Sequence, residues 1–155
     1  MEISQNTDVL IIAAHPDDAE LSCGGTIAQL TAAGKSVVIA DCTRGELGSR
    51  GTAQLRAQET INATKILGVK TRVNLDIPDG NIQQSQENTH SVISLIRRFR
   101  PQIILFNPPY ERHPDHENVH RLVRTAVFQS GLTKIETLFE GIPQATHRPK
   151  HIFSY

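Results

Sequence analysis

The stretch VLIIAAHPDD at residues 9–18 is an apolar run that leads directly into a histidine and two carboxylates. A continuous apolar run is typical of a strand covered on both faces, as in a parallel sheet. A second run, IILF at residues 103–106, precedes a similar polar motif, HPDH at residues 113–116. We expect the two runs to be neighbouring strands that bring both polar motifs to the same edge of one sheet.

Strand and helix patterns alternate along the rest of the chain. Apolar runs predict two further strands, at Val37–Ala40 and Thr71–Ile77. Apolar residues at helical spacing predict helices over Glu20–Ala33, Leu55–Leu67, Glu87–Phe99 and Val119–Val127. Four strand–helix units in series predict an α/β fold with a Rossmann-like, doubly wound and mostly parallel sheet in three layers.

Length and composition predict one domain spanning residues 1–155. The 155 residues are 38% hydrophobic and show no change in composition that would divide them. Sixteen Lys and Arg balance sixteen Asp and Glu, so no net field attracts nucleic acid or an anionic membrane. The run at residues 9–14 is too short for a membrane span, and no basic residue precedes it as in a signal peptide. We therefore expect a cytoplasmic protein, with Cys23 and Cys42 as buried, reduced thiols.

The two polar motifs have the composition of a hydrolytic metal site. Neutral imidazole and carboxylate are ligands of Zn²⁺ in catalytic sites, where three protein groups leave a fourth position for water. In doubly wound sheets ligands bind beyond the carboxyl ends of the strands, where both motifs lie. Taken singly, Asp17 or Asp18 is more typical of a helix N-cap, so it is the pair of motifs that favours a metal.

A dinucleotide is the usual ligand of the first loop in this architecture, and Asp41 at the end of the second strand resembles a ribose-binding acid. The loop, however, carries Asp17, Asp18 and Glu20 where a dinucleotide fold has a Gly-x-Gly-x-x-Gly turn. Adjacent carboxylates repel a pyrophosphate. The sequence therefore favours a cation over a nicotinamide cofactor at this point.

Several motifs, in order along the chain, resemble the LmbE-like deacetylases, which include the N-acetylglucosaminyl-phosphatidylinositol de-N-acetylases. They are HPDDAE at residues 15–20, GGT at 24–26, TRGE at 43–46, LRxxE at 55–59 and HPDH at 113–116. Two further segments, VKTRVNL at 69–75 and RHPDH at 112–116, are most similar to the bacillithiol biosynthesis deacetylase branch. That branch removes acetate from N-acetylglucosaminyl malate.

The resemblance implies a role for each residue of the two polar motifs. It makes His15, Asp18 and His116 the ligands of Zn²⁺, with Fe²⁺ as the alternative metal, and Asp17 the catalytic base. A carboxylate beside activated water accepts its proton as attack begins, which agrees with this assignment.

The second motif also offers a donor to the oxyanion that forms when an amide carbonyl is attacked. We expect a protonated His113 in this role. Asp115, two residues on, is expected to keep the imidazole protonated through its opposite charge.

Two further residues are expected to bind substrate. By resemblance Arg56 faces the sugar or its appended group, and a guanidinium can clamp a carboxylate such as that of malate through two hydrogen bonds. The alternative is an exposed helix charge paired with Glu59. Asp79 is expected to accept hydrogen bonds from sugar hydroxyls, but Pro-Asp-Gly at residues 78–80 is equally a good turn.

The resemblance also implies a small amino-sugar substrate and a homo-oligomer. Members of the family continue well past residue 155, and the terminal HIFSY alternates like the start of a strand. We therefore expect a single domain that lacks its C-terminal part. Two functions stay open from the sequence: a zinc-dependent N-deacetylase, and an inactive sugar- or metal-binding module of the same fold.

Overall fold

The computed structural model describes residues 6–155, which form a three-layer α/β fold around one parallel sheet. Five strands lie in the order β3-β2-β1-β4-β7. Their bounds are Val9–Ala13 for β1, Val37–Asp41 for β2, Thr71–Asn74 for β3, Ile103–Phe106 for β4 and His151–Ser154 for β7. The prediction of a doubly wound, mostly parallel sheet is therefore confirmed.

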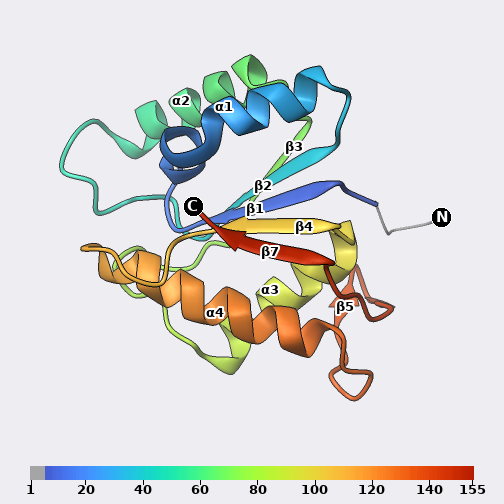
Figure 1. Ribbon diagram of the computed structural model, residues 1–155. Helices are drawn as coiled ribbons and strands as arrows, with labels where there is room; N and C mark the ends of the chain where they lie inside the picture. The colour runs from blue at the N-terminus through green and yellow to red at the C-terminus, as the bar shows by residue number, and fades with distance from the viewer. Residues whose placement is uncertain (1–5) are drawn as a thin grey trace.

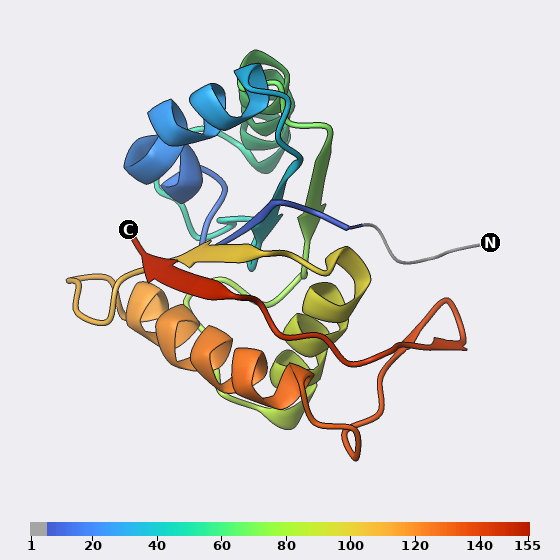
Figure 2. The same cartoon turned by 45° about the vertical axis from the view of Figure 1, so that its right-hand side comes forward.

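Helices cover both faces of the sheet (Figures 1 and 2). One face carries α1 (Asp18–Ala32) and α2 (Ala53–Ile66), and the other carries α3 (Gln86–Phe99) and α4 (Pro114–Ser130). Successive side chains of a strand point to opposite faces, so β1 contributes to both cores. Leu10 and Ile12 pack with α3 and α4, whereas Val9 and Ile11 pack with α1.

The strand order reverses between β1 and β4: β2 and β3 follow on one side of β1, and β4 and β7 lie on the other. These strands pair in parallel, with Val9 opposite Ile103 and Ile12 opposite Phe106. The connection after β1 enters α1 on one face, and the connection after β4 enters α4 on the other face (Figure 2). The point where two such connections diverge is the usual ligand position in doubly wound sheets.

The structure differs from the sequence-based prediction at the end of one strand and in one short hairpin. The strand predicted to reach Ile77 ends at Asn74, because Asp76 has a φ of 54° and turns the chain out of the sheet. A short hairpin, in which β5 (Leu138–Phe139) pairs with β6 (Ile142–Pro143), was not predicted from the sequence. Its two-residue turn, Glu140 and Gly141, has positive φ at both positions, as primed hairpin turns require. The strand expected at the end of the chain is confirmed as β7.

Within residues 6–155, every helix is too short or too polar to cross a lipid bilayer.

Candidate metal centre and active site

Three predicted ligands converge at the carboxyl end of β1. His15 follows β1, Asp18 is the first residue of α1, and His116 lies in the first turn of α4. Nε2 of His116 lies 3.3 Å from Nδ1 of His15 and 3.3 Å from Oδ1 of Asp18. Oδ2 of Asp18 lies 3.6 Å from Nδ1 of His15. In a tetrahedral zinc site with ligands at about 2.0–2.1 Å, the ligand atoms lie about 3.3–3.4 Å apart, so the two separations from Nε2 of His116, to Nδ1 of His15 and to Oδ1 of Asp18, fit the ion.

His113 lies next to the two candidate histidine ligands. Its ring centroid lies 4.7 Å from that of His15 and 4.9 Å from that of His116. The ring nitrogens of all three histidines approach one another within 4.8 Å, so His113 is within reach of anything held by the other two.

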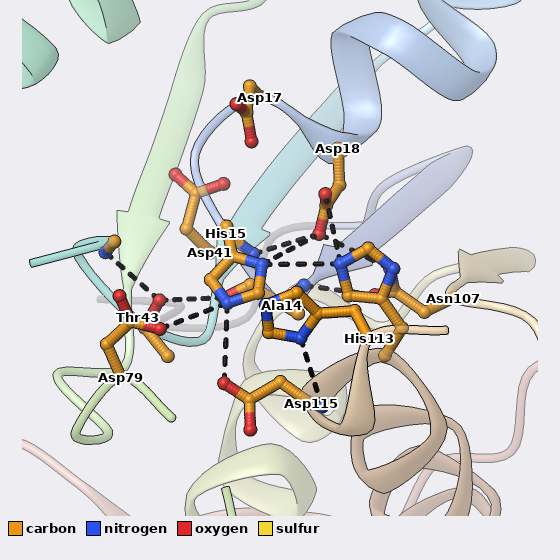
Figure 3. A network of polar contacts seen from close by, with 12 residues as sticks. Ala14, His15, Asp17, Asp18, Asp41, Thr43, Asp79, Asn107, His113 and Asp115 are labelled. Carbon is orange, nitrogen blue, oxygen red and sulfur yellow. Dashed lines mark hydrogen bonds and ion pairs between the residues drawn. The ribbon is translucent and has the colours of Figure 1, made fainter. Parts of the chain in front are cut away.

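The outer nitrogens of both candidate histidine ligands contact carboxylates, and Figure 3 shows those of His15. Nε2 of His15 lies 3.1 Å from Oδ1 of Asp79 and 3.4 Å from Oδ2 of Asp115. Nδ1 of His116 contacts Glu111, the residue directly before RHPDH, which was not singled out from the sequence. Carboxylates that hold the second nitrogen of a metal-binding histidine fix its orientation and raise its basicity.

The electrostatics of the cluster favour a bound cation. Burial alone would lower the pKa of His15, but the hydrogen bond and charge of Asp18 and the charges of Asp79 and Asp115 outweigh it and raise this pKa to about 9. Hydrogen bonds from His116 and His15 hold the pKa of Asp18 well below its usual range, although burial opposes this shift. A metal ion bound here would replace protons, since histidine must be neutral to coordinate it.

Asp115 does not hold His113 as the sequence analysis expected. Its carboxylate accepts a hydrogen bond from the backbone N–H of Gly80 (2.8 Å) and contacts His15 instead. Nδ1 of His113 accepts a hydrogen bond from the backbone N–H of Asp115 (3.3 Å), so His113 is the N-cap of α4. A proton on Nδ1 would break this bond. The ring nitrogen of His113 that is left to donate is therefore Nε2.

Asp17 occupies the N-cap position of α1 without capping the helix. Its side chain accepts no hydrogen bond from the first turn and is 48% exposed. Oδ2 lies 3.4 Å from Nη2 of Arg56, whose Nη1 donates to the carbonyl of Gly45 (3.3 Å). Arg56 thus contacts Asp17 and the loop after β2 rather than Glu59, its alternative partner.

A pocket of about 250 Å³ is lined by the residues predicted to take part in catalysis or substrate binding, apart from Asp115. Its walls include His15, Asp17, Arg56, Asp79 and His113. The carboxylate of Asp79 is already engaged, because Oδ1 contacts His15 and Oδ2 accepts a hydrogen bond from the backbone N–H of Leu47 (2.9 Å). The sequence-predicted groups thus surround one pocket beside the candidate ligands.

Asp41, which resembled a ribose-binding acid, is occupied within the fold. Arg72 donates to both of its carboxylate oxygens, from Nε (2.7 Å) and from Nη2 (2.9 Å). The residue is buried, so it offers no acceptor to a cofactor. This arrangement argues further against the dinucleotide alternative.

Comparison with known families agrees with the geometry of the site. Residues 10–127, which contain both polar motifs, match the PIG-L family, described as GlcNAc-PI de-N-acetylase. The chain belongs to the PIG-L family. The predicted resemblance to LmbE-like deacetylases is therefore confirmed.

Relatives of this PIG-L chain include named deacetylases. A diacetylchitobiose deacetylase of Thermococcus kodakarensis is 37% identical over 80% of this chain and 50% of its own length. A 1D-myo-inositol 2-acetamido-2-deoxy-alpha-D-glucopyranoside deacetylase of Kineococcus radiotolerans is 28% identical over 83% of this chain and 47% of its own length. The crystal structure of the conserved protein TT1542 from Thermus thermophilus is 40% identical, with a TM-score of 0.88, over 96% of this chain and 66% of that one. The chain thus spans about half the length of these two curated relatives.

Proposed function

We propose that this chain is a zinc-dependent N-deacetylase that hydrolyses the acetamide of an N-acetylglucosaminyl compound. The observation that carries the proposal is the convergence of His15, Asp18 and His116, with contacts of 3.3–3.6 Å, beside a pocket that His15, Asp17 and His113 line. Membership of a family of N-acetylglucosamine-type deacetylases supports it. A bound divalent metal would supply water of lowered pKa and polarise a carbonyl oxygen.

Asp17 is the group best placed to accept the proton of the attacking water. Its carboxylate is not used to cap α1 and faces the pocket. Nη2 of Arg56 lies 3.4 Å from Oδ2 of Asp17 and helps to hold this carboxylate at the pocket wall.

His113 lies on the pocket wall and completes the proposed machinery. Its Nδ1 accepts a backbone N–H, so Nε2–H is the donor available to the oxyanion or to the departing nitrogen. The water oxygen becomes part of acetate, the C–N bond breaks, and the protons end on the amine product and the solvent.

For the substrate we propose N-acetylglucosaminyl malate, on the sequence resemblance to the bacillithiol branch and on the place of Arg56. Among the pocket-lining residues Arg56 is the one cationic side chain other than histidine. A malate carboxylate would compete with Asp17 and the carbonyl of Gly45 for this guanidinium. Asp79 keeps lone pairs available for a sugar hydroxyl in addition to its contacts with His15 and Leu47.

Acetate release tests the proposal. The protein is stripped with a chelator, reloaded with Zn²⁺ or Fe²⁺, and assayed with N-acetylglucosaminyl malate and with diacetylchitobiose. We expect metal-dependent acetate release, faster with the malate compound. Stoichiometric metal without acetate from either compound would instead support the inactive binding module. Faster release from diacetylchitobiose would overturn the malate assignment alone.

Further predictions concern the assembly, the location and the partner of the protein. Homo-oligomeric assembly, implied by the family resemblance, is tested by light scattering during size-exclusion chromatography. Cytoplasmic location and a small-molecule partner are tested by cell fractionation and by the assay above.

A further inference from the structure

Asn107 is a buried amide at the carboxyl end of β4, directly behind the candidate metal centre. It is 1% exposed and follows Phe106, the last residue of the strand. Figure 3 places its side chain next to Asp18 and the backbone of Ala14. Neither the polar motifs nor the pocket lining includes this residue.

Hydrogen bonds fix which end of the Asn107 amide faces Asp18. The backbone N–H of Ala14 donates to Oδ1 (3.0 Å), and an N–H group can only donate. The hydroxyl of Tyr155 lies 3.5 Å from the same oxygen. Nδ2 is therefore the atom that faces Asp18, and it donates to Oδ2 of that carboxylate (3.3 Å).

We propose that Asn107 is a positioning residue that makes Asp18 a one-oxygen metal ligand. Oδ2 of Asp18 accepts from two N–H groups, the backbone of His15 (3.0 Å) and the amide of Asn107. Oδ1 is left facing Nε2 of His116, 3.3 Å away. This inference rests on the metal site of the proposed function and adds to it a residue from a different strand.

The isosteric change Asn107→Asp isolates the contact. It keeps an acceptor for the N–H of Ala14 but replaces the donor with an oxygen that repels Asp18. The carboxylate of Asp18 is then free to rotate about its last bond. Since outer partners of metal ligands typically contribute about 10- to 100-fold in affinity, we expect zinc to bind about 10- to 100-fold more weakly.

The experiment measures Zn²⁺ affinity by competition with a chelator, and the visible absorption of the Co²⁺-substituted protein. Asn62→Asp makes the same chemical change on the exposed surface of α2 and is the matched control. Asn107→Ser, which is too short to reach Asp18, serves where Asn107→Asp does not fold, as judged by circular dichroism. We expect weaker binding and an altered Co²⁺ spectrum in a folded Asn107 variant, with no change in the control.

Parental affinity and an unchanged Co²⁺ spectrum in a folded Asn107 variant would overturn the positioning role, even if the parent protein releases acetate. If the parent protein binds metal but releases no acetate, the deacetylase proposal is overturned. The Zn²⁺ affinity of the Asn107 variant still decides the role of Asn107 in that case. A parent that binds no metal overturns both.

Discussion

Each of the three side chains that we assign to the metal is fixed by a contact on its far side. Asp79 and Asp115 hold His15, Glu111 holds His116, and Asn107 holds Asp18. Such contacts restrict the rotamers of the ligands before an ion arrives, so less conformational entropy is lost on binding. At the scale of single residues, the site is therefore organised by groups that do not themselves face the metal.

Replacing His116 with alanine removes one of three ligands. The remaining His15 and Asp18 should hold zinc much more weakly, because structural and catalytic zinc sites use three or four protein ligands. Metal content after dialysis measures the effect, and His90→Ala on α3 is the control. Stoichiometric zinc in the His116 variant, with unchanged activity, would contradict the ligand assignment.

Replacing Asp17 with asparagine should leave metal content unchanged and lower turnover about 10²- to 10⁴-fold, because an amide cannot accept the proton of water. Steady-state rates of acetate release measure this, with Glu59→Gln as a control on an exposed neighbouring carboxylate. Deacetylation by Asp17→Asn at the parental rate would move the base elsewhere. Glu20 is a poor substitute, because the structure pairs it with Arg72.

The change Asp115→Asn tests whether Asp115 acts on His15, as in the structure, or on His113, as expected from the sequence. The carboxylate contacts Nε2 of His15, so its loss should weaken zinc binding about 10- to 100-fold. If Asp115 instead keeps His113 protonated, as expected from the sequence, the change would leave zinc intact and lower the alkaline limit of activity. Chelator competition and a pH–rate profile of the same variant distinguish the two, and intact zinc with a shifted alkaline limit would refute the contact with His15.

At the scale of elements, the sequence predicted what depends on local pattern. The apolar runs identified β1, β2 and β4, and the two motifs after β1 and β4 do meet at one sheet edge. The direction of the Asp115 carboxylate was not predictable, because it depends on the N–H of Gly80, 35 residues away in the chain. Asn107 was missed for the same reason, because Ala14 and Asp18 lie on other elements, and a single sequence carries no signal of such contacts. Glu111 is close to His116 in the chain, but its contact depends on how the loop before α4 folds, which no local pattern indicates.

Arg72 ties three elements together, and this makes its removal costly. It lies on β3, donates to Asp41 on β2 and contacts Glu20 on α1. The side chains of Arg72 and Asp41 are 7% and 3% exposed, so Arg72→Met leaves a buried carboxylate unpaired. We expect a loss of about 3–5 kcal/mol in the free energy of unfolding, measured with urea.

The Arg72 prediction has two controls. Arg44→Met breaks the pair with Asp76, whose side chains are 64% and 62% exposed, and should cost less than about 1 kcal/mol. Adding Asp41→Leu to Arg72→Met should recover most of the loss, because the unpaired charge is gone. If Arg72→Met and Arg44→Met lowered the free energy of unfolding equally, burial of the Arg72–Asp41 pair would make no difference to stability.

At the scale of the whole molecule, the site depends on both helical layers. His15 and Asp18 come from the β1–α1 side, whereas Asn107, His113 and His116 come from the β4–α4 side. The pocket adds Arg56 from α2 and Asp79 from the loop after β3. Nearly all of the sheet must therefore be folded before the metal centre exists, and conditions that unfold the chain abolish the site as a unit.

The buried thiols predict a loss of whole-molecule stability at alkaline pH. Burial, and to a lesser degree the charge of Glu20, raises the pKa of Cys23 from 9.0 to about 11, and burial also raises the pKa of Cys42. Below pH 9 these thiols keep their protons in the folded and the unfolded chain, so they add no pH dependence. Above pH 9 the unfolded chain loses protons that the folded chain retains, so the free energy of unfolding falls with rising pH. For Cys23 the fall is at most about 1.4 kcal/mol per pH unit and ends near pH 11.

Urea unfolding of the chelator-treated parent and of Cys23→Ala, between pH 8 and pH 11, measures the fall in the free energy of unfolding. The contributions of other titrating groups cancel in the difference between the two proteins. The parent should lose stability more steeply than the variant above pH 9, and parallel curves would show that Cys23 ionises in the fold as it does in the unfolded chain.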